Sequence, residues 1–284
     1  MTTTARAAIA LALALALAGC SIASPDTPVS TPPGEGSSPA EPGPSSLAPS
    51  VDPSAPRELD LDAELSALEE EFDATVGVSA LDSATGTHVD FRADEPFGFA
   101  STIKLFAAAV MLRELPHEQR AERLSWTRFD VSDAGHAPVT AQHVRNGLTV
   151  LELTEAAVRE SDNLALNLVV QQLGGPEGLT AGLAELGDAT TRVTDVEPAL
   201  NEPDLETGDN ATTPAAFTAT VARVLEPGTL DPADLELLLE WTSENATGDT
   251  LVRAGAPEGW TVRDKSGGAG PMRNDVAIVT PPDG

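Results

Sequence analysis

Ser101 and Lys104 are three residues apart at the start of an apolar stretch that runs to Leu112. A helix over this stretch places both side chains on one face, about one turn apart. The N-terminus of a helix favours negative charge on the serine oxygen, and a neutral lysine amine can accept the serine proton. The pair is a candidate nucleophile and base, although the same spacing also arises by chance.

Lysine is rare in this chain. Only Lys104 and Lys265 are lysines, while the other 14 basic residues are arginines. A lysine amine can lose its proton when it is desolvated, whereas an arginine guanidinium stays charged. The two lysines are therefore candidates for proton transfer, and the alternative is that they remain by chance.

Two further motifs follow along the chain. Ser161-Asp162-Asn163 lies where a helical stretch over 149–173 breaks, and Lys265-Ser266-Gly267 ends an expected strand over 259–266. Alone, the first is typical of a helix-capping turn, and the second of a strand end before a glycine turn. Together with the serine–lysine pair, they form an ordered set that also contains both lysines.

The elements that must position these residues are predicted from periodicity and turn signals. We expect a helix over 58–73, a hairpin of strands over 75–81 and 87–92, a buried helix from Ser101 that Pro116 stops, and strands over 259–266 and 274–280. Helix starts are indicated at Thr149 with Glu152, at Thr213-Pro214 and at Asp231-Pro232. Strands at both ends predict an α+β protein whose terminal strands share one sheet.

The three motifs resemble the S-x-x-K, S-D-N and K-T-G set of class A β-lactamases and penicillin-binding proteins, with Ser266 in place of threonine. Residues 197–201, Glu-Pro-Ala-Leu-Asn, resemble the E-P-x-L-N segment of the class A omega loop, which penicillin-binding proteins generally lack. From about residue 58 onward the chain is identified as a class A serine β-lactamase. The resemblance implies an antiparallel sheet flanked by helices (about 57–97 and 244–284) and an all-helical part (about 98–243).

This resemblance implies hydrolysis of β-lactam antibiotics through an acyl-enzyme on Ser101, and resistance to them. It leaves the acylation base open between Lys104 and Glu197 acting through a water, and it makes Glu197 the base for the deacylating water. Ser161 is expected to relay a proton to the lactam nitrogen. The implied substrate-binding residues are Asn163, Asn201, Lys265, Ser266, Gly267, Gly268, Arg273 and His136, with the backbone N–H groups of Ser101 and Gly268 as the oxyanion hole. A surface role is the alternative for Arg273, and His136 stands where the family usually has an aromatic gatekeeper.

Two departures from the family pattern are visible. The omega loop is usually held by an Arg–Asp ion pair between its ends, but the matching positions are Asp195 and Asn210, so we expect a weaker clamp and slower deacylation. The sequence also ends at Gly284, where relatives continue with a strand and a helix. We therefore expect a C-terminally truncated fold of low stability, and a thermal transition like that of full-length relatives would contradict this.

The N-terminal residues resemble a bacterial lipoprotein leader. Arg6 precedes an apolar run over 7–18 that is too short to span a bilayer, and Leu-Ala-Gly-Cys at 17–20 resembles a lipobox. We expect a signal peptide over 1–19, a lipid on Cys20, and a disordered Pro/Ser-rich tether over 20–56 before the catalytic region 57–284. An ordinary signal peptide is the alternative. Cys20 is the only cysteine, so no disulfide is expected. The protein is expected to be exported and anchored in the cell envelope.

The composition of the chain limits the classes of molecule that it is expected to bind. A formal net charge of −29 argues against nucleic acid, which requires a basic surface. The motifs suggest no metal or cofactor, so a small β-lactam is the expected partner of a monomer. Three hypotheses stay open at this point: an active β-lactamase, a penicillin-binding enzyme that acylates slowly, and a lipoprotein made inert by the early end of the chain.

Overall fold

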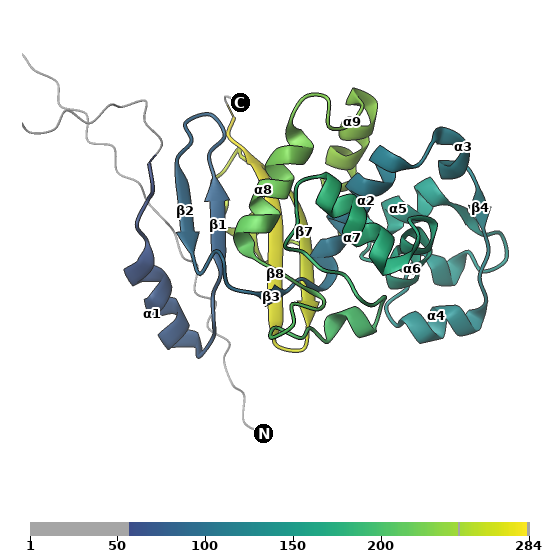
Figure 1. Ribbon diagram of the computed structural model, residues 1–284, viewed down its shortest axis with the longest axis horizontal. Helices are drawn as coiled ribbons and strands as arrows, with labels where there is room; N and C mark the ends of the chain where they lie inside the picture. Colours follow the sequence, from purple (N-terminus) through teal and green to yellow (C-terminus); the bar gives the residue numbers. More distant parts are fainter. Residues whose placement is uncertain (1–56, 244, 283–284) are drawn as a thin grey trace, which may run out of the picture. The chain divides into compact units, whose positions relative to one another are not determined.

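The computed structural model describes residues 57–243 and 245–282 (Figure 1). The expected signal peptide over 1–19, the lipid site at Cys20 and the tether over 20–56 lie outside these residues. Within the described residues, the longest apolar helices fall short of what a membrane span requires.

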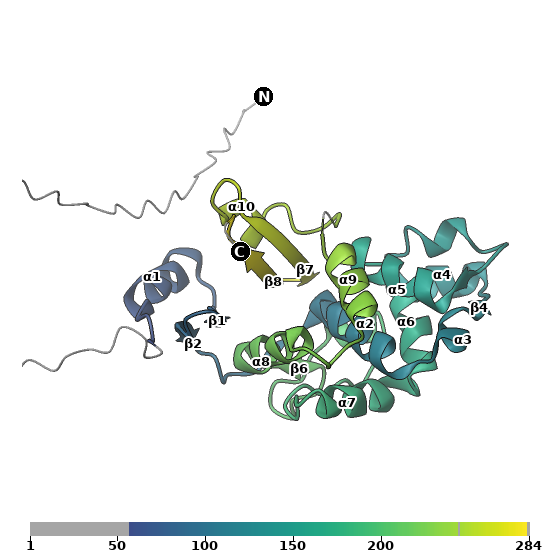
Figure 2. The same ribbon diagram turned by 90° about the horizontal axis from the view of Figure 1, so that it is seen from above.

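Helices occupy the middle of the described chain, and strand pairs lie near both ends (Figures 1 and 2). The helices are α1 Asp62–Phe72, α2 Ile103–Glu114, α3 His117–Arg120, α4 Arg128–Ala134, α5 Val150–Arg159, α6 Asn163–Gln172, α7 Gly175–Glu185, α8 Pro214–Leu225, α9 Pro232–Trp241 and α10 Val252–Gly255. The strands are β1 Val78–Leu81, β2 His88–Phe91, β3 Phe97–Gly98, β4 Arg123–Leu124, β5 Leu148–Thr149, β6 Ala211–Thr212, β7 Thr261–Ala269 and β8 Met272–Thr280.

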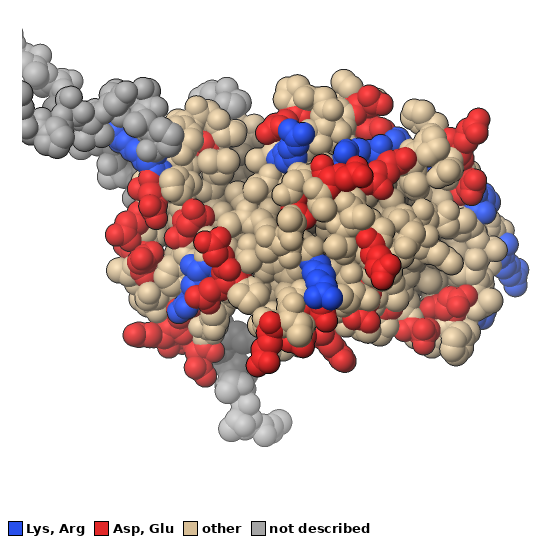
Figure 3. Space-filling model, viewed as in Figure 1, with Lys and Arg blue, Asp and Glu red and all other residues tan. Residues whose placement is uncertain are grey.

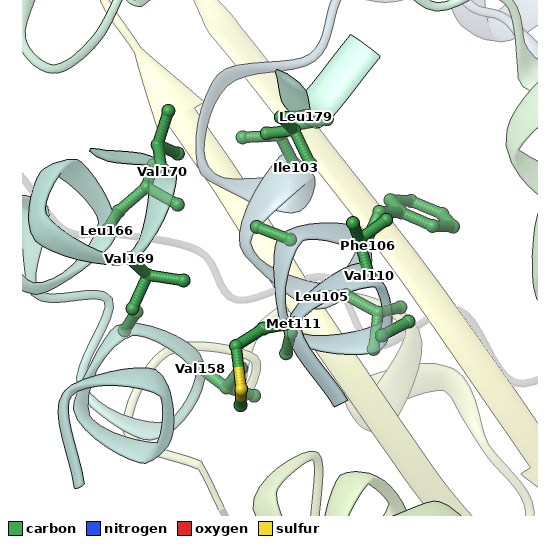
Figure 4. Close-up of a cluster of buried hydrophobic side chains, with 14 of the residues drawn as sticks. Ile103, Leu105, Phe106, Val110, Met111, Val158, Leu166, Val169, Val170 and Leu179 are labelled. Atoms are coloured by element: carbon green, nitrogen blue, oxygen red, sulfur yellow. The ribbon is translucent and has the colours of Figure 1, made fainter. Parts of the chain in front are cut away.

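Helix α2 forms the centre of the hydrophobic core. Every residue from Ile103 to Leu112 is buried, as expected for a helix that is apolar on all sides. Helices α5, α6, α7 and α9 pack around it, and Figure 4 shows side chains from α2 facing Val158, Leu166 and Val170. The helix ends at Glu114 before Pro116, as the sequence predicted.

The two terminal hairpins form separate ladders. Strand β1 pairs with β2 from Val78↔Phe91 to Leu81↔His88, and β7 pairs with β8 over nine residues of each strand. The prediction of one shared sheet is therefore wrong at the level of hydrogen bonding, since β1 and β8 do not pair with each other in the described part of the chain. Helix α8 contacts both strands and connects the two hairpins through packing (Figure 1).

The helix starts indicated by the sequence are confirmed at all three sites. Thr149 and Glu152 form the expected capping box at the start of α5, and the Thr213 side chain accepts a hydrogen bond from the Ala216 amide at the start of α8. Asp231 occupies the N-cap position before Pro232 in α9, although its side chain makes no capping hydrogen bond.

Acidic side chains outnumber basic ones on the face that Figure 3 shows. Figure 3 shows Asp and Glu residues spread across the viewed face, with Lys and Arg isolated among them. This distribution agrees with 45 acidic residues against 16 basic ones.

Phe106 offers a direct test of the core. Its ring lies 4.2 Å from that of Phe217 and is almost fully buried, so Phe106→Ala should lower the free energy of unfolding by about 3–5 kcal/mol. Denaturant titration measures this change. Phe129→Ala is the matched control, because Phe129 is 74% exposed, and it should change stability by less than about 0.5 kcal/mol. Equal losses in the two variants would contradict this description of the core.

Candidate active site

Ser101 lies in a 3₁₀ turn, Ala100–Thr102, directly before α2. The Thr102 amide donates to the Phe99 carbonyl at 3.2 Å, and strand β7 packs against the turn. A Cβ atom on Gly267 would lie 3.0 Å from the Phe99 carbonyl oxygen and 3.1 Å from the Ser101 nitrogen. Glycine at 267 therefore lets the strand approach the backbone of the nucleophile turn.

The Lys104 amine joins the elements of the site. Its Nζ donates to Ser101 Oγ at 2.8 Å, to the Ser161 carbonyl at 2.9 Å and to Asn163 Oδ1 at 2.7 Å. Glu197 Oε1 lies 3.0 Å from the same nitrogen as an ion pair. A protonated lysine has three N–H groups, and four oxygens from four segments of the chain lie within reach of them.

Lys104 and Glu197 are a buried pair. Neither side chain has exposed surface, so each charge has lost its hydration. Burial lowers the pKa of the Lys104 amine, and the negative charges of Glu197 and Asp162 oppose that shift. An amine with a lowered pKa can accept a proton more readily near neutral pH.

The turn at 160–162 holds Ser161 in a left-handed backbone conformation, with φ of 54°. Asp162 fixes this turn: its carboxylate accepts hydrogen bonds from the Val139 and Thr140 amides at 2.9 Å and caps α6 through the Ala165 amide at 2.9 Å. The helix-capping interpretation is confirmed, and the same turn places Ser161 and Asn163 in the lining of the cavity described below.

Glu197 is held by amide side chains. Asn167 in α6 brackets its backbone, accepting from the Glu197 amide and donating to the Glu197 carbonyl, both at 2.8 Å. Asn201 donates to Glu197 Oε2 at 2.5 Å. These contacts fix the carboxylate orientation from both the helix and the loop.

Lys265, in strand β7, also reaches the Ser161 hydroxyl. Its Nζ donates to Ser161 Oγ at 3.2 Å and to the Ser266 carbonyl at 2.8 Å. Burial, followed by repulsion from Lys104, lowers the pKa of Lys265 to about 7. The Ser161 hydroxyl thus lies between two amines, because Lys104 Nζ is 3.3 Å from the same oxygen.

These side chains surround a cavity of about 280 Å³. Its lining residues are Ser101, His136, Ser161, Asn163, Glu197, Asn201, Thr247, Ser266 and Gly268. Lys104, Lys265 and Gly267 are buried and are not among the lining residues. A second hollow of about 360 Å³, beside Pro257 and Trp260, contains none of the sequence-predicted residues.

Arg273 and His136 differ in position. Arg273 is absent from the cavity lining, and its Nη1 donates to the Gly270 and Met272 carbonyls at 2.9 and 2.6 Å. His136 does line the cavity, with Nε2 3.1 Å from the Glu160 carbonyl oxygen. Within residues 57–243 and 245–282, His, Cys, Asp and Glu side chains form no group of three that could hold a metal.

Three contributors were missed by sequence reasoning: Asp162 as an anchor, Asn167 and Thr247. Asn167 lies four residues after Asn163 on α6, so helical spacing could have placed both on one face. Thr247 lies in an irregular segment whose position depends on contacts with β7, and no local pattern indicates it.

A hydrogen-bonded clamp between Asp195 and Asn210 closes the neck of the loop between residues 192 and 210. Asn210 Oδ1 accepts from the Thr194 and Asp195 amides at 3.0 and 3.2 Å, and its Nδ2 donates to Asp195 Oδ2 at 2.8 Å. Next to it, Arg192 and Asp209 form an exposed ion pair at 3.1 Å. A hydrogen bond thus joins 195 and 210 where relatives have an ion pair, and the Arg192–Asp209 pair adds little because the Arg192 side chain is exposed.

Comparisons with known proteins agree with this geometry. Residues 60–284 match the sequence model of a family described as the beta-lactamase enzyme family. Beta-lactamase of Bacillus licheniformis is 45% identical over 219 residues, covering 76% of this chain and 70% of the relative. That of Streptomyces cellulosae is 42% identical over 255 residues, covering 88% and 79%.

Solved structures extend the similarity to the fold. The class A beta-lactamase from Clostridium kluyveri DSM 555 has a TM-score of 0.73 at 38% identity, covering 78% of this chain and 84% of that one. An ancestral class A beta-lactamase has a TM-score of 0.73 at 42% identity, covering 78% and 86%. These likenesses confirm the predicted α+β fold class.

The hydrogen bond between Asp195 and Asn210 can be tested by exchanging the two side chains. Asn210→Asp removes the donor to Asp195 and places a second carboxylate beside it, so the free energy of unfolding should fall by about 1–2 kcal/mol. A Glu-specific protease should then cut faster after Glu202 or Glu206 in the loop, as measured by mass spectrometry. The Asp195→Asn, Asn210→Asp double variant restores a donor and should recover most of the loss. A double variant as unstable as the single one would refute the clamp.

Proposed function

This chain belongs to the beta-lactamase enzyme family as a class A serine β-lactamase, and we propose that it opens the lactam ring through an acyl-enzyme on Ser101. As a member of this family it is a hydrolase of β-lactams that confers resistance to them. One observation carries the mechanism: Lys104 Nζ lies 2.8 Å from Ser101 Oγ and 3.0 Å from Glu197 Oε1.

In the acylation step, Ser101 Oγ attacks the carbonyl carbon of the lactam and its proton passes to the neutral Lys104 amine. The developing negative charge on the carbonyl oxygen meets the backbone N–H groups of Ser101 and Gly268. The carbon–nitrogen bond of the ring then breaks, and the nitrogen takes the Ser161 hydroxyl proton. That hydroxyl is replenished from Lys104, whose amine lies 3.3 Å away.

In the deacylation step, a water attacks the ester carbon of the acyl-enzyme. Glu197 takes the proton of this water, and Asn201 holds the Glu197 carboxylate in place. The carbon–oxygen bond to Ser101 breaks, the proton that Glu197 took from the water passes to the serine oxygen, and the ring-opened acid leaves with Glu197 ionised again. Because Glu197 and Ser101 both line the cavity, one water there can reach both the carboxylate and the ester.

The binding roles proposed here follow the family resemblance, and the presence of Ser266, Asn163 and His136 in the cavity lining supports them. Lys265 and Ser266 meet the substrate carboxylate, and Asn163 meets the side-chain amide from the other wall. His136 lies at the exposed rim, where its ring can pack on the substrate. Arg273 donates to carbonyls of its own turn, so a contact with the substrate requires its guanidinium to leave that turn.

Glu197→Gln separates the steps of this mechanism. The variant should acylate with a chromogenic β-lactam at a near-normal rate and then stall, because deacylation loses its base and should slow by at least about 100-fold. Stopped-flow absorbance gives a burst of one product per enzyme, and intact-protein mass spectrometry detects the acyl adduct. Glu202→Gln, on the same loop and exposed, is the matched control and should turn over normally.

The other outcomes are informative. If acylation also collapses in Glu197→Gln, Glu197 rather than Lys104 is the acylation base. A single stoichiometric burst from the unchanged protein indicates a slow acylator of the penicillin-binding type. No reaction with the unchanged protein would refute the proposed function.

We also propose that the protein is exported and held in the cell envelope by a lipid on Cys20, with residues 20–56 as a tether. The support is the sequence alone: Arg6, the apolar run over 7–18 and the only cysteine at position 20. Cys20→Ser should move β-lactamase activity from the membrane fraction to the medium or the soluble fraction. Unchanged partition into membranes would argue against the anchor.

A further inference from the structure

One face of the β7–β8 hairpin is turned toward the active site. Residues directly opposite each other in an antiparallel ladder share a face, and so do residues two apart along one strand. Lys265 pairs with Val276, and Gly267 pairs with Asn274. Because Lys265 reaches the Ser161 hydroxyl, Gly267 and Asn274 lie on the face that is turned toward the site.

Gly267 and Asn274 both lie against the segment that leads to Ser101. A Cβ at position 267 would lie 3.0 Å from the Phe99 carbonyl oxygen, so glycine lets β7 approach this backbone closely. Asn274 Nδ2 donates a hydrogen bond to the Gly98 carbonyl at 2.7 Å. Within one cross-strand pair, the glycine therefore makes room for the segment and the asparagine binds it.

Gly98 is also enclosed by other elements. It pairs with Ala211 in the β3–β6 ladder. A Cβ on Gly98 would lie 2.6 Å from Pro203 Cγ, in the loop between residues 192 and 210, and 2.7 Å from Met272 Sδ at the start of β8. Strand β6, this loop and strand β8 therefore meet at a residue that lies three positions before Ser101.

The backbone that enters the nucleophile turn is strained. Ala100 has a left-handed φ of 46°, a conformation that persists only where the surroundings enforce it. The Thr102 amide and hydroxyl both donate to the Phe99 carbonyl. Asn274 holds the preceding carbonyl, that of Gly98. Two successive carbonyls are thus fixed by hydrogen bonds directly before the strained residue.

We propose that Asn274 is a positioning residue for acylation: by holding the Gly98 carbonyl, it fixes the turn that contains Ser101 and the backbone N–H group of that serine. This inference rests on the proposed function, in which the N–H groups of Ser101 and Gly268 meet the charge that develops on the lactam carbonyl oxygen. Gly268 follows Gly267 in β7, so the cross-strand pair sets the position of one donor relative to the other. Such donors act because they are in place before the reaction, and displacing one of them should slow acylation.

Asn274→Leu removes the donor and keeps a side chain of similar size. The variant is compared with its parent in a Glu197→Gln background, in which the acyl-enzyme accumulates. Acylation by a chromogenic β-lactam, followed by stopped-flow absorbance, should be slower than in the parent by about 10- to 100-fold. Asn274→Ala deletes the same donor without placing apolar atoms beside the carbonyl, and it should give a loss in the same range.

The infrared band of the acyl-enzyme ester separates positioning from a general loss of stability. With a β-lactam labelled with ¹³C at the lactam carbonyl, the ester band reports the hydrogen bonds that this carbonyl accepts. A displaced Ser101 N–H group weakens these bonds, so the band should move to higher wavenumber in both Asn274 variants. A residue that only stabilises the fold would leave the band in place.

Thr218→Val is the matched control. Thr218 Oγ1 donates to the Ser79 carbonyl at 2.9 Å and joins α8 to β1, so the variant also removes a hydrogen bond between a side chain and a strand carbonyl. Neither residue lines the active-site cavity. In the same Glu197→Gln background, Thr218→Val should leave the acylation rate and the ester band unchanged.

A slower acylation together with the band shift, in the Asn274 variants alone, supports the positioning role. An acylation rate within about twofold of the parent, an ester band that stays in place, or the same changes in Thr218→Val would overturn it. If the unchanged protein does not react with the β-lactam, the proposed function fails instead, and the two failures are thereby distinguished.

Discussion

A buried ammonium is the constraint on which the site depends. Lys104 is the charged residue in a run of ten buried residues of α2, and an isolated charge in such a place costs far more than a domain can offset. The structure compensates it with three hydrogen-bond acceptors and the Glu197 carboxylate. Those acceptors come from the nucleophile turn, the 160–162 turn, α6 and the omega loop. The same nitrogen therefore assembles the catalytic groups and requires each of those segments to be in place.

The groups around the Lys104 amine come from two kinds of segment, namely tight turns and a loop. The nucleophile precedes the most buried helix, and left-handed residues, Ala100 and Ser161, shape the two turns that face each other across it. Strain of this kind persists only where the surroundings enforce it. Glu197 instead comes from a loop, which Asn167 and Asn210 fasten through backbone hydrogen bonds. The turn can thus hold the nucleophile in a fixed position, while the fastened loop holds the carboxylate that positions the water.

Local signals in the sequence predicted much of this site. Helical spacing placed Ser101 beside Lys104, and the capping box at Thr149 located α5, because both depend on neighbours within one turn. Contacts between segments that are distant in the chain could not be predicted from such local patterns. The two hydrogen bonds between Asn167 and the Glu197 backbone join residues 30 apart, and the pairing of Asp275 with Ser266 depends on the register of β7 and β8. The shared sheet was wrongly predicted for the same reason, since alternation identifies strands but not their partners.

Burial lowers the pKa values of both lysines of this chain, and because there are only two lysines, each amine can be measured directly. Uniform ¹³C,¹⁵N-lysine labelling gives two side-chain signals, from Lys104 and Lys265, which NMR can follow through a pH titration. We expect both amines to titrate below the ordinary lysine value of about 10.4, and Lys265 near 7. Two signals that both titrate near the ordinary value would show that the amines are solvated, and would contradict the buried cluster at the centre of this structure.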